Sequence, residues 1–99
     1  MKKFDERSLN KYRNMDCTKV FPFICKYFKE DAEFTPIKSS STSRWNVNSA
    51  GRDYELLITR CKWYDTMAKT GGGGAVDLTM HLLEMDFVPA VKLLNKLIK

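Results

Sequence analysis

The chain has 99 residues and carries 17 lysines and arginines against 12 aspartates and glutamates, which gives a net charge of +5. This length suits one small domain and excludes a large multidomain enzyme. No stretch reaches the roughly 20 apolar residues of a membrane span, and the N-terminus lacks the apolar segment of a signal peptide. Three cysteines, an odd number, favour free thiols in a reducing cytoplasm over a secreted disulfide scaffold, so we expect a cytoplasmic protein.

The excess positive charge lies in two regions. Residues 1–15 carry a net charge of +3, residues 16–34 carry −1, residues 35–70 carry +3, and residues 71–99 are balanced. We expect residues 1–15 to be a basic N-terminal arm, followed by one domain over residues 16–99. Such an arm is either a frayed terminus or a segment that becomes ordered on a phosphate backbone or an acidic partner.

A helix is predicted over residues 17–28, with Asp16 as its cap. Pro22 falls early enough for the first turns of this helix to tolerate it. The charged run 29–31 is expected to end the helix. Its apolar side chains recur at three- and four-residue spacing: Val20, Phe21, Ile24, Tyr27 and Phe28.

Short segments rich in aromatic and β-branched residues follow, and they predict a three- or four-stranded antiparallel sheet. We expect strands over residues 33–38, 44–48, 54–59 and 61–65, with breaks at the serines 39–41 and at residues 48–51. Trp45 and Val47 alternate with polar neighbours, which is the period-two pattern of a half-buried strand.

Four consecutive glycines, residues 71–74, are expected to form a turn between the last strand and a helix. This turn either lets the helix pack on the sheet or presents backbone N–H groups to a nucleic-acid phosphate. The helix that follows the glycines is expected to stop near Met85, and Asp86 can cap a final helix over residues 87–97. We assign the apolar faces of this helix pair to the core: Val76, Met80, Leu83, Phe87, Val91 and Leu94.

The side chains that could serve as soft metal ligands are those of Cys17, Cys25, Cys61 and His81. No two of these residues have the close spacing of a zinc-binding turn. We therefore expect buried thiols, no metal and no cofactor. A nucleophilic Cys61 or serine with His81 as its base would need an orienting group and an oxyanion hole, and no motif supports either. We expect no catalytic activity and no small-molecule substrate.

Basic and aromatic residues are interleaved along the predicted strands. Single-stranded nucleic acid binds such surfaces, because the rings stack on bases while Arg and Lys hold the phosphates. The alternative is that Trp45, Trp63 and Tyr64 are core residues and that the cations are merely solvated. The candidate nucleic-acid-binding residues are Arg44, Arg52, Arg60, Lys62, Trp63, Tyr64, Lys69, Gly72 and Gly73.

The stretch KWYDTMAKTGGGGAVDL (62–78), with Met80-His81-Leu82 and DFVPAVKLL (86–94), resembles the N-terminal zinc-ribbon domain of bacterial and phage DNA primases. It looks closest to the versions found in primase-like proteins of plasmids and mobile elements. In that family an aromatic strand pair leads into a Gly-Gly turn, a helix of the Asp-Leu/Phe-x-Met type and a second helix of the Phe-x-x-Ala-Val type. The resemblance covers roughly residues 33–97.

The zinc ligands of the family have no counterpart here. The family binds zinc through a Cys-x-x-His pair and a Cys-x-x-Cys pair. The second pair would fall near Met67 and Thr70, and the first has no counterpart between residues 38 and 47. The resemblance implies a zinc-ribbon-like, metal-free α+β domain in which packing of Trp45, Trp63 and Met67 replaces the metal.

The family's domain contacts template DNA and does not hold the polymerising active site. The resemblance therefore implies a non-catalytic accessory subunit for DNA replication or primer synthesis. It would bind single-stranded DNA beside a separate polymerase, primase or helicase of a plasmid, phage or mobile element. The alternative is a protein–protein adaptor with little DNA binding, whose contact residues would lie on the first predicted helix: Phe21, Phe23, Ile24, Tyr27 and Phe28.

Overall fold

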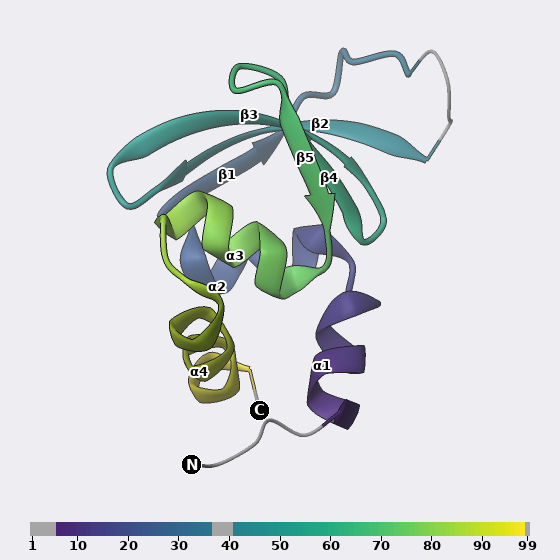
Figure 1. Ribbon diagram of the computed structural model, residues 1–99. Helices are drawn as coiled ribbons and strands as arrows, with labels where there is room; N and C mark the ends of the chain where they lie inside the picture. The colour runs from purple at the N-terminus through teal and green to yellow at the C-terminus, as the bar shows by residue number, and fades with distance from the viewer. Residues whose placement is uncertain (1–5, 37–40, 99) are drawn as a thin grey trace.

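The computed structural model describes residues 6–36 and 41–98, which form a five-stranded antiparallel sheet with helices before and after it (Figure 1). The strands lie in chain order, so each one pairs with its neighbour in the sequence. They are β1 (Tyr27–Glu30), β2 (Thr42–Ser49), β3 (Arg52–Thr59), β4 (Lys62–Asp65) and β5 (Thr70–Gly73). The predicted α+β class is confirmed, with one strand more than the three or four expected.

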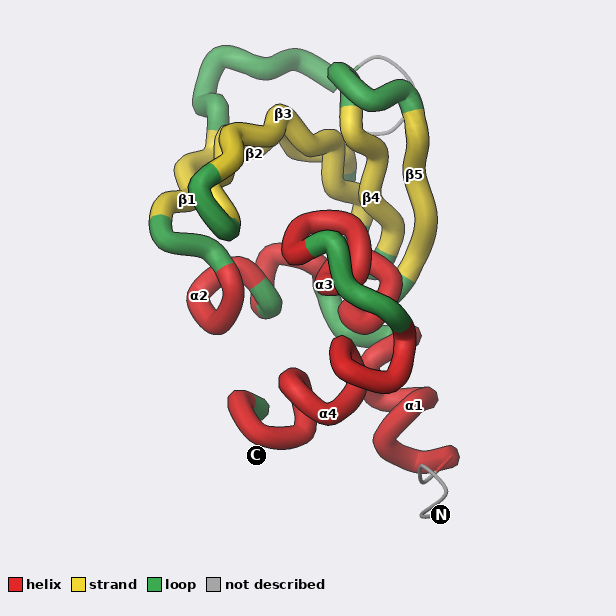
Figure 2. The backbone as a smooth tube through the Cα atoms, turned by 60° about the vertical axis from the view of Figure 1, so that its left-hand side comes forward, coloured by secondary structure: helices red, strands yellow, loops and turns green. Residues whose placement is uncertain are grey.

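The helices all lie on one side of the sheet, and the other side carries no helix in the described part of the chain (Figures 1 and 2). They are α1 (Glu6–Arg13), the 3₁₀ turn η1 (Cys17–Lys19), α2 (Phe21–Ile24), α3 (Ala75–Leu83) and α4 (Phe87–Leu97). We call the helix-covered side the inner face and the other side the outer face. Successive strand residues alternate between the two faces.

The core fills the space between the inner face and the helices. Strand residues Val47, Leu56, Ile58 and Trp63 are at most 5% exposed. They face side chains from every helical element: Tyr12, Cys17, Val20, Phe21, Ile24, Ala75, Leu78, Leu82 and Leu94. The strands predicted over residues 44–48, 54–59 and 61–65 correspond to β2, β3 and β4, so the sequence located these three strands correctly.

The helix predicted over residues 17–28 is wrong in its second half. Asp16 does cap a helical turn, since its side chain accepts a hydrogen bond from the Thr18 N–H, but that turn is the short η1. Pro22 then stands at the start of the four-residue α2, and Cys25 is extended (φ −109°, ψ 136°). The chain continues as β1, whose backbone pairs with β2 in antiparallel register.

Two other local predictions also fail. Residues 33–36 of the strand predicted over 33–38 form no strand, because Asp31 starts a turn by accepting hydrogen bonds from the backbone N–H groups of Glu33 and Phe34. Residues 37 and 38 lie outside the described residues. The glycine run is mostly strand: Gly71–Gly73 pair with β4, and only Gly74 has a positive φ, of 88°, at the start of α3.

Part of the predicted basic arm belongs to the domain. Residues 6–13 form α1, and Tyr12 in this helix is only 2% exposed. The Tyr12 hydroxyl donates a 2.6 Å hydrogen bond to the Asn95 side chain of α4, so the two ends of the chain are joined. Residues 1–5 lie outside the described residues.

The C-terminal helix pair is confirmed, and α4 has the predicted bounds. Asp86 stands at the cap position of α4, although its side chain makes no capping hydrogen bond. The predicted core face is only partly correct. Val91 and Leu94 are fully buried, whereas Phe87 is 44% exposed. In α3 the buried face is Leu78 and Leu82, and the expected core residues Val76, Met80 and Leu83 are half-buried beside it.

Candidate nucleic-acid interface

The outer face carries a row of cross-strand partners that includes two of the expected site residues. Arg44 on β2 lies opposite Leu57 on β3, which lies opposite Tyr64 on β4, which in turn lies opposite Gly71 on β5. Tyr64 is 42% exposed, so its ring is accessible from the outer face. Lys62, two residues before Tyr64 on the same strand, points to the same side and is exposed.

Trp63 is not part of this surface. It lies on the inner face and is 5% exposed, with its ring centroid 4.6 Å from that of His81. The alternation along β4 therefore sends the two neighbouring aromatic side chains to opposite faces. Of the two rings expected on the interface, the structure leaves Tyr64 exposed and places Trp63 in the core. Trp45, the other tryptophan, is half-buried against Phe21 at a centroid separation of 5.4 Å.

Two of the expected cations already have acidic partners. The Arg44 guanidinium donates to Asp31 Oδ2, 3.0 Å from Arg44 Nε, and also lies 5.1 Å from the centroid of the Phe34 ring. These hydrogen bonds from Arg44 hold the pKa of Asp31 below its usual range. Arg52 forms a 2.6 Å ion pair with Glu84 at the end of α3. Arg44 and Arg52 therefore contribute little free positive charge.

The outer face is acidic in its middle. Asp53 and Glu55 lie on the outer side of β3, since they alternate with the buried Leu56. Asp53 accepts a hydrogen bond from Asn48 on the neighbouring strand β2, and Glu55 accepts one from the Thr66 hydroxyl. A polyanion would be repelled from this region, so a nucleic-acid site on the outer face must lie toward β4 and β5.

The other three cations expected in the site, Arg60, Lys62 and Lys69, lie at two different ends of the sheet. Arg60 stands in the turn between β3 and β4, next to Lys62, whereas Lys69 stands in the turn between β4 and β5 at the other end of these strands. All three are exposed, and none of them forms an ion pair within residues 6–36 and 41–98. Arg60 and Lys62 therefore form a basic corner of the sheet, distant from Lys69 along the strand direction.

Two further cations reach this corner from the N-terminal helices, and the sequence reasoning did not include them. The backbone N–H of Cys17 donates to the Arg60 carbonyl at 2.8 Å, which brings η1 with its exposed Lys19 beside the turn. Arg13 at the end of α1 packs against Gly74, whose N–H donates to the Cys61 carbonyl at 2.7 Å. We call Lys19, Arg60 and Lys62 the basic corner, and Arg13 lies beside it.

The four glycines at residues 71–74 differ in how much room the fold leaves for a side chain. A Cβ on Gly71 would lie 2.6 Å from the Trp63 carbonyl oxygen, and one on Gly72 would lie 1.7 Å from Asp77 Oδ2. Gly74 has a positive φ and packs on the backbone of α1. A Cβ on Gly73, by contrast, would meet only the Cys61 carbonyl oxygen, at an ordinary 3.8 Å. The fold therefore requires glycine at positions 71 and 74, whereas a side chain at position 72 would have to displace the Asp77 carboxylate. The exposed Gly73, opposite Lys62, is not required by the fold.

The expected protein-contact residues divide into buried and exposed members. Phe21 and Ile24 belong to the core. Phe23 on α2 and Tyr27 and Phe28 on β1 are 45%, 52% and 39% exposed. Tyr27 lies opposite Asn48 on the outer face, whereas Phe28 lies opposite Val47 on the inner face, 6.1 Å from the Phe21 ring centroid. We call these three residues the aromatic edge, because β1 is an edge strand of the sheet.

The cysteines and the histidine are placed for packing. Burial raises the pKa of the Cys17 thiol to about 12, and burial likewise raises that of Cys25 to about 12. His81 Nε2 lies 2.7 Å from Asp65 Oδ2, which joins α3 to β4 on the inner face. Within the described residues, no three His, Cys, Asp or Glu side chains gather in a way that could hold a metal ion.

Neither a family model, nor a curated protein, nor a solved structure matches this chain. Among the helices of residues 6–36 and 41–98, none combines the length and the apolar character needed to cross a membrane.

Proposed function

We propose that this chain is a non-catalytic accessory subunit that binds single-stranded DNA at the basic corner and at Tyr64. The observation that carries the proposal is a group of exposed cations beside an accessible aromatic ring: Lys19, Arg60 and Lys62 make no ion pair with any residue that the structure describes. A ring of this kind stacks on a base, and the cations neutralise neighbouring phosphates.

Gly73 supports the same location. It lies opposite Lys62, and its lack of a side chain leaves the outer face open beside Tyr64 without being required by the fold. A phosphate backbone can therefore approach the strand closely at this position. The middle of the sheet, where Asp53 and Glu55 lie, would repel the same backbone.

The place of this binding in replication or primer synthesis rests on the resemblance to primase zinc-ribbon domains. The family's domain contacts template DNA and does not hold the polymerising active site, so the DNA binding proposed here would serve a polymerase, primase or helicase. The host would be a plasmid, a phage or another mobile element.

The test compares two double variants that remove the same charge. Arg60→Gln/Lys62→Gln removes two cations that form no ion pair in the described part of the chain, and Arg44→Gln/Arg52→Gln removes two that are already neutralised. Binding of a labelled oligo-dT of about 16 nucleotides is followed by fluorescence anisotropy at low salt. We expect the first variant to lose most of the affinity and the second to stay within about threefold of wild type. Equal losses would show that only net charge matters and would contradict the assigned surface.

Tyr64 supplies a second readout that net charge does not affect. Stacking of one base contributes about 1–3 kcal/mol, so Tyr64→Ala should weaken binding about tenfold, while Tyr64→Phe should retain most of it. The side chain lies on the outer face and is 42% exposed, so both variants should fold. If Tyr64→Ala bound DNA with wild-type affinity, the Tyr64 ring would not be part of the binding site.

The second candidate function is a protein–protein adaptor, and the aromatic edge favours it. Phe23 on α2 and Tyr27 and Phe28 on the edge strand β1 expose three large rings around one edge of the sheet, and exposed large apolar side chains mark contact surfaces. A Phe23→Ser/Tyr27→Ser variant that keeps DNA affinity but loses co-purification with a replication protein of its host would establish this function. A variant that kept both its DNA affinity and its co-purification would exclude the adaptor function.

A further inference from the structure

The free edge of β5 presents unshielded backbone groups. In an antiparallel pair, opposite residues alternate between hydrogen-bonded and non-hydrogen-bonded pairs. The Gly74 N–H donates to the Cys61 carbonyl, so Cys61 and Gly74 are a hydrogen-bonded pair, and two positions along the strands Trp63 and Gly72 form the next one. The backbone groups of Gly71 and Gly73 consequently point away from β4. Asp77 Oδ2 accepts from the Gly73 N–H at 3.0 Å, which agrees with this orientation. The Gly71 N–H and the carbonyls of Gly71 and Gly73 remain directed to the open side.

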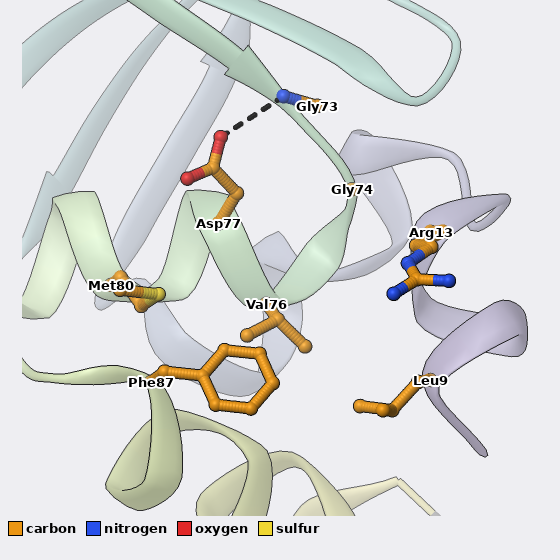
Figure 3. A pocket seen from close by; sticks show the side chains of 8 residues that line it. All are labelled: Leu9, Arg13, Gly73, Gly74, Val76, Asp77, Met80 and Phe87. Carbon is orange, nitrogen blue, oxygen red and sulfur yellow. Dashed lines mark hydrogen bonds between the residues drawn. The ribbon is translucent and has the colours of Figure 1, made fainter. Parts of the chain in front are cut away.

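Two hollows lie along α3 beside this edge. The first, of about 220 Å³, is bounded by the end of β5, by Val76 and Met80 of α3, and by Leu9 of α1 and Phe87 of α4. Figure 3 shows these apolar side chains converging on it. The second, of about 390 Å³, lies farther along α3 and reaches Thr70 at the start of β5. Because Asp77 and Met80 border both hollows, they form one groove between α3 and the edge of β5.

The two ends of this groove have different charge. Arg13 lies at the end with the apolar hollow, as Figure 3 shows. Glu84 and Asp86 lie at the other end. A wall of the second hollow is formed by Trp63, whose buried indole N–H is the one buried side-chain polar atom without a hydrogen-bond partner in the described part of the chain.

We propose that this groove binds an extended segment of a partner protein, which adds a sixth strand to the sheet at β5. Main-chain hydrogen bonds to Gly71 and Gly73 would hold the segment, as in other cases of strand addition beside a helix. A large apolar side chain would fill the first hollow, since a cavity of about 150 Å³ already accommodates a benzene ring. Charge complementarity selects an acidic residue next to this anchor, facing Arg13, and a basic residue toward Asp86, since Glu84 already pairs with Arg52.

This site is separate from the proposed DNA surface. The groove lies on the helix side of β5, whereas Tyr64 and Lys62 lie on the outer face. The proposal does not depend on DNA binding, and the variants that test the two sites share no residue.

The experiment selects peptides from a phage-displayed library of random dodecapeptides on the full chain. The enriched peptides are synthesised with a fluorescent label, and their affinities are measured by anisotropy. We expect them to share a large apolar residue beside Asp or Glu. Binding should shift the amide resonances of Gly71 and Gly73 and slow the hydrogen exchange of Gly71.

A matched pair of variants tests the anchor. Phe87→Ser removes a wall of the apolar hollow, whereas Val88→Ser changes the next residue, which is 46% exposed and does not border it. We expect about tenfold weaker binding for Phe87→Ser and less than a twofold change for Val88→Ser. Arg13→Glu should weaken the acidic peptides, and replacing their acidic residue by lysine should restore affinity to this variant.

Several results would overturn the proposal. These are a library without enriched sequences, peptides equally sensitive to both serine variants, and resonance shifts confined to other elements. Occupation of the groove by oligo-dT, or self-association of the chain through β5, would equally replace the proposed partner segment by another occupant.

Discussion

The glycines of β5 allow a sharp test of the packing, because two of them differ by one contact. A Cβ added at Gly71 would lie 2.6 Å from the Trp63 carbonyl oxygen and 3.0 Å from Tyr64 Cδ1, and the same atom at Gly73 would meet nothing closer than 3.8 Å. Neither glycine has a positive φ, so alanine is compatible with both backbone conformations. Gly71→Ala and Gly73→Ala therefore share the same change in the unfolded chain.

The shared term is a stabilisation of about 0.4–1 kcal/mol, because alanine restricts the unfolded chain. Only Gly71→Ala adds overpacking, which costs about 1–3 kcal/mol, since the carbonyl that it meets is part of the β4 ladder and cannot move freely. We expect Gly73→Ala to be as stable as wild type or slightly more so, and Gly71→Ala to be less stable by about 1–3 kcal/mol than its partner variant.

Thermal unfolding followed by circular dichroism measures this difference. In a domain of this size 1 kcal/mol corresponds to about 4–8 °C in Tm, so the two variants should differ by at least about 4 °C. Equal Tm values would refute the reasoning, because they would mean that β5 does not lie against β4 in the register described. A lower Tm for Gly73→Ala than for Gly71→Ala would contradict it more strongly.

Four other predictions concern the core and the titrating groups. Tyr12→Ala should lower the free energy of unfolding by about 3–5 kcal/mol in urea, because its ring is buried, while Tyr12→Phe should lose only about 0.5–1.5 kcal/mol for the bond to Asn95. Burial raises the pKa of Asp65, but hydrogen bonds from Ala68 N–H, His81 and Met67 N–H outweigh it and hold the pKa below its usual value. Asp65 thus stabilises the fold above the pKa of the unfolded chain, and urea titrations should show this stability lost as the pH falls through the lower folded-state pKa. Asp65→Asn should be less stable than wild type at pH 7 and should lack this part of the acid dependence. Cys17 and Cys25, whose thiol pKa values burial raises to about 12, should resist a thiol reagent at pH 8 in the native protein, and mass spectrometry should find Cys61 labelled first.

The sequence predicts best those elements whose side chains alternate or repeat along the chain. β2 and β3 place Trp45, Val47, Leu56 and Ile58 on one face at every second position, and this pattern located both strands. The break predicted at residues 48–51 is also correct, since Ala50 and Gly51 both have the positive φ that a two-residue hairpin turn requires. Helix α4 was found with its bounds because Asp86 precedes a regular apolar repeat.

The errors arose where one residue pattern fits two structures. Phe21, Ile24 and Phe28 have helical spacing, yet Phe28 belongs to a strand, because β2 offers its backbone a partner that is distant in the sequence. β5 gives no side-chain pattern at all, and glycine is among the residues least common in strands. Its strand is held by pairing with β4 and by Asp77, which are tertiary contacts.

The candidate site likewise depends on contacts that the sequence does not reveal. The sequence identified the cations, but it contained no information on which of them meet a carboxylate. Asp31 lies 13 residues from Arg44, and Glu84 lies 32 residues from Arg52, so both ion pairs depend on the fold. Arg13 and Lys19 reach the basic corner only because the N-terminal helices pack against the end of the sheet.

The salt dependence of DNA binding tests the central claim most directly. If Lys19, Arg60 and Lys62 each neutralise one phosphate of a single strand, the logarithm of the association constant should fall with the logarithm of the salt concentration with a slope of about −2. The Arg60→Gln/Lys62→Gln variant should show a slope close to −0.7, and the Arg44→Gln/Arg52→Gln variant should keep the wild-type slope. A wild-type slope near zero, or no binding of oligo-dT at low salt, would contradict the account.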